Sequence, residues 1–305
     1  MKRFIITVDT EGDNLWAWKP GDVIGTENAK YVDRFQKLCE KYKYIPVYLC
    51  NYEMINDDNF CSYISQKAAL GCCEIGMHLH AWNSPPLFEL NNVYGGQSYI
   101  TEYTRQQILE KHLYLRDLIK EKTGFTPVSY RAGRWATDET LFSVLDEIGI
   151  KVDCSVTPGV SMEHCPGMTV QGGNSYAGYP CAPYKLTDNL IEVPMTTKLM
   201  KCFEGRSLKN KIGNFIRGKQ FWLRPAIHHY DDMKRLINQM ESEGNGYLEF
   251  MIHSSELMPG GSPYGKDEAA VERIYQRMEK VFDLVSNNYD GISMADYYTE
   301  IIGKL

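Results

Sequence analysis

Short runs of β-branched and apolar residues alternate along this chain with longer segments of helical periodicity. This alternation restricts the possible folds more than any other feature. Strand-like runs are expected at 3–9, 45–50, 72–80, 127–132, 151–156, 190–195 and 247–253. Helical patterns are expected at 29–43, 58–70, 104–122, 137–148, 231–243 and 267–286. Strands and helices that alternate in this way form parallel βαβ units. Seven or eight such units predict an α/β fold whose parallel strands close into a barrel.

The 305 residues are expected to form a single domain, 1–305. This length allows either one large barrel or two smaller domains. No segment has the composition of an interdomain linker, so one domain is favoured. Residues 158–190 are rich in glycine, proline, tyrosine and cysteine. We expect this segment to be a long structured excursion over the functional face of the barrel.

Composition excludes several classes of protein. The hydrophobic content of 43% and charged content of 24% are typical of a globular chain, and the net charge of −6 argues against a nucleic-acid partner. The N-terminal MKRFIITVDTEGD becomes acidic too early for a signal peptide, and no apolar run is long enough to span a membrane. We therefore expect a cytoplasmic protein without stable membrane insertion. Its nine cysteines, which include no CxxC motif, should be free thiols.

Ionisable side chains stand at the ends of five expected strands. They are Asp9 and Glu11, His78 and His80, Arg131, Asp153, and His253. Each alone is equally compatible with a structural role, such as a solvated acidic turn or an ordinary ion pair. The carboxyl ends of barrel strands, however, meet on one face, where the active sites of such barrels lie. The convergence of five strand ends therefore predicts a functional site.

The histidine pair lies in the stretch EIGMHLHAW, residues 74–82. Side chains two residues apart on a strand point to the same side, which holds for His78 with His80 and for Asp9 with Glu11. Two interpretations follow from the residues alone. Glu11, His78 and His80 form a three-ligand metal site that leaves a position open for water. Alternatively, the histidines pack on the strand and His80 only orients a neighbour.

The order of these motifs resembles that of the NodB-type polysaccharide deacetylases, carbohydrate esterase family 4. The resemblance covers most of the chain: an acidic motif (DTEGD), Glu-Ile-Gly-x-His, an arginine motif (RAGRW), an aspartate motif and a late histidine. The segments DTEGD, HLHAW and HSSEL look like a bacterial subgroup associated with surface-polysaccharide gene clusters. The resemblance implies a distorted (β/α) barrel of seven or eight parallel strands, the NodB homology fold. It also implies a hydrolase that removes an N-acyl group from an amino sugar or polysaccharide precursor.

The resemblance also assigns roles to individual residues. Asp9 takes the position of the general base, and Glu11, in place of the more usual aspartate, that of a metal ligand. His78 matches the first histidine ligand, whereas Trp82 stands where the second is normally found. Arg131 matches the arginine that fixes the base, and Asp153 the aspartate that orients the late histidine. His253 is the expected general acid. The implied cofactor is Zn²⁺ or another divalent transition metal.

Aromatic and basic residues suggest the substrate. Trp135 falls where the family supplies an aromatic wall of the acyl pocket, and Trp16 and Trp18 follow the acidic motif. Trp16 and Trp82 are expected, with Trp135, to contact a carbohydrate, although loop packing explains Trp16 and Trp18 equally well. The run 206–224 contains six basic residues and no acid. It is either one solvated helix face or a surface that meets a lipid-linked sugar at a membrane.

Two other functions are compatible with the sequence. The chain could hydrolyse another non-peptide C–N or ester bond, because barrel relatives with an altered second motif act on cyclic amides. It could also be a barrel that has lost catalysis and only binds carbohydrate. The presence of Asp9, Arg131 and His253 argues against the second alternative, since a binding module needs no ordered base and acid.

Overall fold

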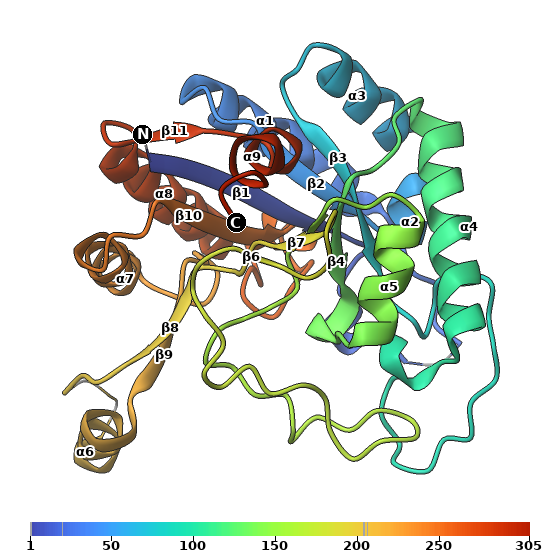
Figure 1. Ribbon diagram of the computed structural model, residues 1–305. Helices are drawn as coiled ribbons and strands as arrows, with labels where there is room; N and C mark the ends of the chain where they lie inside the picture. The colour runs from blue at the N-terminus through green and yellow to red at the C-terminus, as the bar shows by residue number, and fades with distance from the viewer. Residues whose placement is uncertain (1, 20, 204, 206) are drawn as a thin grey trace.

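The computed structural model describes residues 2–19, 21–203, 205 and 207–305. In this part of the chain, the central feature is a nine-stranded sheet with the order β10-β1-β2-β3-β4-β5-β7-β6, and β11 pairs with the start of β1 (Figure 1). Its strands are β1 (Lys2–Thr10), β2 (Pro46–Cys50), β3 (Glu74–Leu79), β4 (Ser129–Ala132), β5 (Val152–Asp153), β6 (Tyr184–Lys185), β7 (Ile191–Glu192), β10 (Tyr247–His253) and β11 (Tyr289–Gly291).

The sheet confirms the predicted barrel class. All neighbouring pairs are parallel except β6 with β7, so eight of these nine described strands run in one direction. The sheet curls, and the gap between β7 and β10 is bridged by other segments. Glu249 N of β10 donates to Thr196 Oγ1 at 2.8 Å, and Met251 N donates to Leu223 O at 3.1 Å. The result is a distorted barrel rather than an evenly closed one.

Two expected strands are much shorter than predicted. The expected strand 151–156 is reduced to β5, and 190–195 to β7. Beyond β5 a side chain interrupts the regular ladder, because Val156 N donates to the Glu192 carboxylate at 3.0 Å, although Met195 N still donates to Val156 O at 2.9 Å. Residues 158–190 form the expected long excursion, in which the described regular structure is limited to β6 and a bridge between Ser161 and Ser175.

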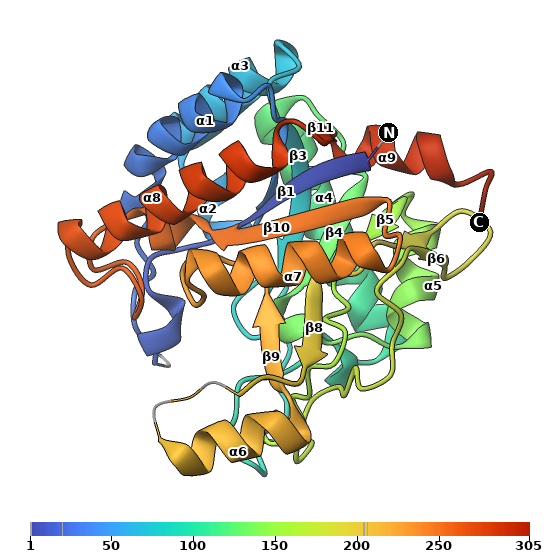
Figure 2. The same cartoon turned by 90° about the vertical axis from the view of Figure 1, so that its left-hand side faces the viewer.

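The helices cover the outside of the sheet (Figures 1 and 2). They are α1 (Val32–Lys41), α2 (Tyr52–Ile55), α3 (Asp58–Ala69), α4 (Arg105–Thr123), α5 (Glu139–Glu147), α6 (Leu208–Arg217), α7 (Tyr230–Ser242), α8 (Glu268–Val285) and α9 (Met294–Ile301). Short 3₁₀ turns occur at Leu15–Ala17, Glu27–Tyr31, Ile100–Glu102, Gly133–Trp135 and Ser254–Leu257. Local sequence signals set both ends of the long helix α4: Thr104 caps its N-terminus by accepting from Gln107 N, and Gly124 ends it with a left-handed φ of 81°.

The alternation of side chains along β1 places the functional site. Phe4, Ile6 and Val8 pack in the larger core cluster, with apolar residues of α1 and α8. Ile5 belongs to the smaller interior cluster, where Met294 and Tyr297 of α9 also pack. Thr7 and Asp9 follow Ile5 at the same two-residue period. The barrel interior is therefore apolar near α9 and becomes polar toward the carboxyl end of β1.

A second, antiparallel sheet consists of β8 (Thr197–Met200) and β9 (Lys219–Trp222), with α6 between them in sequence. Most of the predicted basic run 206–224 lies in α6 and β9, although residue 206 is outside the described residues. Among the described helices, none combines the length and the apolar character that crossing a membrane requires. Each of the nine cysteines is unpaired.

Candidate active site

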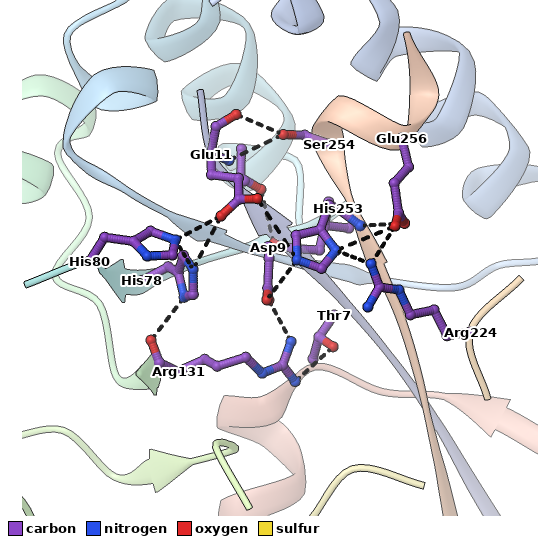
Figure 3. Close-up of polar contacts among 12 residues, drawn as sticks. Thr7, Asp9, Glu11, His78, His80, Arg131, Arg224, His253, Ser254 and Glu256 are labelled. Carbon is purple, nitrogen blue, oxygen red and sulfur yellow. Dashed lines mark hydrogen bonds and ion pairs between the residues drawn. The ribbon is translucent and has the colours of Figure 1, made fainter. Parts of the chain in front are cut away.

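The structure brings most of the predicted strand-end residues together at one end of the barrel, namely Asp9, Glu11, His78, His80, Arg131 and His253 (Figure 3). Asp9 lies near the end of β1, and Glu11 follows that strand. His78 lies on β3, and His80 follows it. His253 is the last residue of β10 and pairs in register with Asp9. Asp9, Glu11, His78 and His253 are all at most 7% exposed, so they act on one another with little screening by water.

Glu11, His78 and His80 form a tight group of ligand atoms. His80 Nε2 lies 2.8 Å from Glu11 Oε2 and 3.1 Å from His78 Nε2. The remaining distance, from His78 Nε2 to Glu11 Oε2, is 3.5 Å. The described residues thus place one carboxylate oxygen and two imidazole nitrogens around a single point. This is a donor set of the kind that binds catalytic zinc with one position left open.

The hydrogen bonds of His78 test whether this group fits a cation, whereas Nδ1 of His80 has no partner among the described residues. His78 Nδ1 lies 2.9 Å from the backbone oxygen of Arg131. A carbonyl can only accept, so Nδ1 carries the proton and, in the neutral ring, the lone pair of Nε2 points at Glu11 and His80. Such a second hydrogen bond is how proteins orient metal-binding histidines. These residues therefore fit a divalent cation.

Arg131 holds Asp9 from inside the barrel. Its NH1 donates to Asp9 Oδ1 at 2.5 Å, and its NH2 donates to Thr7 Oγ1 at 3.0 Å and pairs with Glu249. Burial alone would raise the pKa of Asp9, but the charges of Arg131, His78 and His253 outweigh it and hold this pKa below its ordinary value. Asp9 is therefore an ionised carboxylate with one oxygen bound by Arg131.

His253 is oriented by residues other than the predicted one. Arg224 NH2 donates to His253 Nδ1 at 3.0 Å and pairs with Glu256, whose carboxylate also accepts from His253 N at 3.0 Å. A guanidinium has only donors, so Nδ1 accepts and the neutral ring carries its proton on Nε2. That nitrogen lies 3.7 Å from Asp9 Oδ2 and 3.8 Å from Glu11 Oε1. His253 thus presents an N–H to the site.

The predicted orienting role of Asp153 toward His253 needs correction. Asp153 lies on β5, where its Oδ1 accepts from Ser155 Oγ at 2.6 Å. The buried carboxyl of Asp153 also lies beside the buried carboxyl of Glu192. In the described chain Asp153 makes no contact with His253. Burial raises the pKa of both carboxyls, and their mutual proximity further raises that of Glu192.

Aromatic rings surround the entrance to this cluster. A cavity of about 510 Å³ opens above it. Its lining residues are Asp9, Glu11, Leu15, Trp16, His78, His80, Trp82, Gln97, Ala132, Arg134, Trp135, Met162, Cys165 and His253. The ring centroid of Trp16 lies 4.9 Å from that of His253, and Trp82 lies 4.2 Å from Trp18 and 5.5 Å from His80. The three predicted substrate-contacting tryptophans, Trp16, Trp82 and Trp135, all line the cavity.

Several residues of the site are not predicted by the sequence, among them Arg224, Glu249, Arg134 and Glu256. A signal for Arg224 is present: it ends the apolar run FWLR, and Arg131 lies at the comparable place near the end of β4. Cavity residues from the 158–190 excursion, Met162 and Cys165, carried no such signal, because only their position in space brings them to the site.

One partly buried acid near the site gives a pH prediction. Glu53 accepts from the side-chain amides of Asn51 at 2.6 Å and Asn83 at 2.7 Å, and burial raises its pKa to about 7. The folded state therefore binds a proton more tightly than the unfolded state, whose pKa is near the ordinary 4.5. The stabilisation from this proton is full below pH 4.5 and is lost as the pH rises through about 7.

We expect the free energy of unfolding of the wild type to fall relative to that of Glu53→Gln between pH 5 and pH 8, by on the order of 2 kcal/mol. Urea denaturation of both proteins across this range measures the difference. Glu121→Gln, at an exposed position on α4, is the matched control and should show no such trend. Parallel stability curves for the wild type and Glu53→Gln would contradict the assignment.

Comparison with known proteins gives a fold likeness. No family model matches the chain. No curated protein matches it by sequence either. A provisionally assigned polysaccharide deacetylase from Mycobacterium smegmatis aligns over 99% of this chain and 91% of its own, with 16% identity and a TM-score of 0.55. A 4-alpha-glucanotransferase from Thermococcus litoralis aligns over 99% of this chain and 38% of its own, with 11% identity and a TM-score of 0.51. At these identities the likeness shows the fold: this chain has the distorted barrel of the Mycobacterium smegmatis structure.

Proposed function

We propose that the protein is a metal-dependent hydrolase that removes an N-acyl group, acetyl above all, from an amino sugar or polysaccharide precursor. One observation carries the proposal. Three groups meet within about 4 Å at the floor of a tryptophan-lined cavity. They are the buried Asp9 carboxylate fixed by Arg131, the Glu–His–His ligand group, and the Nε2–H of His253. The Mycobacterium smegmatis structure with the same fold is described as a polysaccharide deacetylase, and the motif order of this chain supports the same class.

Glu11, His78 and His80 are the residues that would hold the metal. A divalent cation at this point supplies Lewis-acid polarisation of the acyl carbonyl and of the attacking water. The protein keeps the ligand atoms ready for it. Burial would raise the pKa of Glu11, but the charge of His253 and hydrogen bonds from His78 and His80 hold this pKa well below its usual range. Glu11 therefore offers an ionised carboxylate at any physiological pH.

Asp9 is positioned to accept the proton of the attacking water. Arg131 binds its Oδ1, which fixes the carboxylate plane, while Oδ2 faces His253 across 3.7 Å. A general base must reach the water that it deprotonates and must be ionised beforehand, and the Arg131 ion pair satisfies the second condition. Glu249 and Thr7 bind the other terminal nitrogen of the guanidinium, NH2, so that the Arg131 side chain is held in place.

His253 is positioned to protonate the leaving amine. Its Nε2–H faces the cavity, whereas Nδ1 faces Arg224 and Glu256. Cleavage of the C–N bond leaves the electron pair on nitrogen, which takes up the Nε2 proton of the imidazolium form of His253 as the amine departs. The ring then returns to its neutral form, and in the imidazolium form the Glu256 carboxylate, 3.7 Å from Nδ1, compensates the charge. Trp16 packs against the His253 ring and limits its rotation, while the rings of Trp82 and Trp135 offer flat apolar surfaces to the sugar.

Release of acetate from N-acetylated amino sugars tests the function. We expect the purified protein to release acetate and a free amine in equal amounts from N-acetylglucosamine oligomers or a related acylated amino sugar. Asp9→Asn is the matched control and should release both at least about 100-fold more slowly. Release of acid only from O-acyl esters would indicate the ester-hydrolysing alternative. Saturable sugar binding without product, in protein with full metal content, would indicate a carbohydrate-binding barrel and contradict the proposal.

A further inference from the structure

Helix α6 projects from the body of the protein. Figure 2 shows it at the outer end of the β8–β9 sheet, away from the central sheet. None of its ten residues is buried, whereas the other helices of eight or more residues each bury at least two side chains among the residues described. Its N-terminus is nevertheless well formed, because Ser207 caps it by accepting from Asn210 N. The helix therefore forms without the packing that normally stabilises a helix of this length.

The exposed side of α6 is apolar. Leu208, Ile212, Phe215 and Ile216 are 67%, 46%, 59% and 64% exposed. Their spacing of four, seven and eight residues puts them on one face of the helix. Phe203, whose ring centroid lies 6.4 Å from that of Phe215, extends this face. We call these five residues the α6 apolar face. Monomeric proteins rarely leave so large a contiguous apolar surface in water without a binding role.

The charged side chains of helix α6 itself are all positive. Helix α6 carries Lys209, Lys211 and Arg217 and no acid, in a chain whose net charge is −6. Within the described residues these three side chains form no ion pair. An apolar helix face bordered by Lys209 and Lys211, with Arg217 on the polar side, is the pattern of helices that lie in the headgroup region of anionic membranes. Pairing with a second copy would instead bring two positively charged faces together, which costs free energy.

The β8–β9 sheet connects α6 to the candidate active site. Trp222 on β9 lies with its ring centroid 5.5 Å from that of Trp135, which lines the cavity. The other end of β9 begins at Lys219, just after α6. At about 3.4 Å per residue, the four residues of β9 place the helix roughly 10 Å along the sheet from the cavity wall.

We propose that α6 binds the surface of an anionic phospholipid membrane, with its apolar face in the acyl-chain boundary and its basic residues at the headgroups. Since no described helix is able to cross a bilayer, the protein lies on the membrane instead of spanning it. This binding does not depend on catalysis. Combined with the proposed function, it specifies the substrate class as acylated amino sugars carried by a membrane lipid, presented to a cavity held near the surface.

Vesicle co-sedimentation of the full chain tests the proposal. We expect the wild type to sediment with vesicles of phosphatidylcholine mixed with phosphatidylglycerol, and at least tenfold less with pure phosphatidylcholine. The double variant Ile212→Asp/Phe215→Asp should bind the mixed vesicles at least tenfold more weakly. Lys209→Glu/Lys211→Glu should weaken binding by roughly tenfold or more and remove much of its salt dependence. None of these side chains is buried, so the variants should fold normally.

Leu70→Asp, at a position 75% exposed on the far end of α3, is the matched control and should sediment as the wild type does. Wild type that stays in solution with the mixed vesicles would overturn the proposal. So would equal binding by the Ile212→Asp/Phe215→Asp variant. If the wild type binds no vesicles but self-associates in light scattering, and the Ile212→Asp/Phe215→Asp variant does not self-associate, the α6 apolar face binds a second copy instead. A failed deacetylase assay would leave all these outcomes unchanged.

Discussion

Asp9→Asn and His253→Ala are each expected to lower turnover by about 10²–10⁴-fold, the usual contribution of a general base or acid. An amide cannot take the water proton that the Asp9 carboxylate accepts. Alanine at position 253 removes the N–H that faces the cavity at 3.7 Å from Asp9. Steady-state kinetics on the acylated amino sugar measure the loss, which should fall on kcat more than on KM because neither group is placed to bind the sugar.

Two controls separate this loss from misfolding or metal loss. Asp117→Asn changes an exposed carboxylate and should leave turnover unaltered. Asp9→Asn should keep the metal content of the wild type, because Asp9 is outside the Glu11–His78–His80 group. Near-wild-type turnover in either active-site variant would remove that residue from the mechanism.

His78→Ala is expected to abolish stoichiometric metal binding, and His80→Ala to weaken it strongly. Each histidine supplies one of three ligand atoms that lie within 3.5 Å of one another, so the loss of one leaves two ligands for the cation. Metal per chain, measured by elemental analysis after purification without added metal, should fall from one to near zero in His78→Ala. His164→Ala, at an exposed position, is the control and should retain one ion.

The two variants also distinguish the interpretations left open by the sequence. Full occupancy in His80→Ala would mean that His80 only orients a neighbour. If the wild type holds no metal and still hydrolyses its substrate after chelation, the metal-dependent mechanism is wrong, and Asp9 and His253 act alone. Trp82 lines the cavity 5.5 Å from the His80 ring, so this position, normally a histidine in the family that the sequence resembles, contributes a wall to the site.

Much of the fold was predictable because its signals are local. Periods of two and of about 3.6 residues are properties of a short segment, so the strand at 3–9 and the helix at 104–122 were found close to β1 and α4. The alternation also predicted parallel pairing, since helical crossovers return each strand in the same direction. The predicted strands at 151–156 and 190–195 were too long, because the Glu192 carboxylate accepts from Val156 N and interrupts the regular ladder there. An interaction between segments more than thirty residues apart leaves no periodicity in either one.

The site divides in the same way. The sequence predicted one cluster of Asp9, Glu11, His78, His80, Arg131 and His253, because each lies at or next to the carboxyl end of a strand of a parallel barrel and such strand ends meet on one face. The pairs of side chains that orient one another were evident only in the folded chain. Arg224 rather than Asp153 binds His253, and Glu249 shares Arg131 with Asp9. The apolar face of α6 also stays exposed in the folded chain. A hydrogen bond, or the packing of one segment over another, depends on distances of a few ångströms between remote segments, and no local pattern encodes those distances.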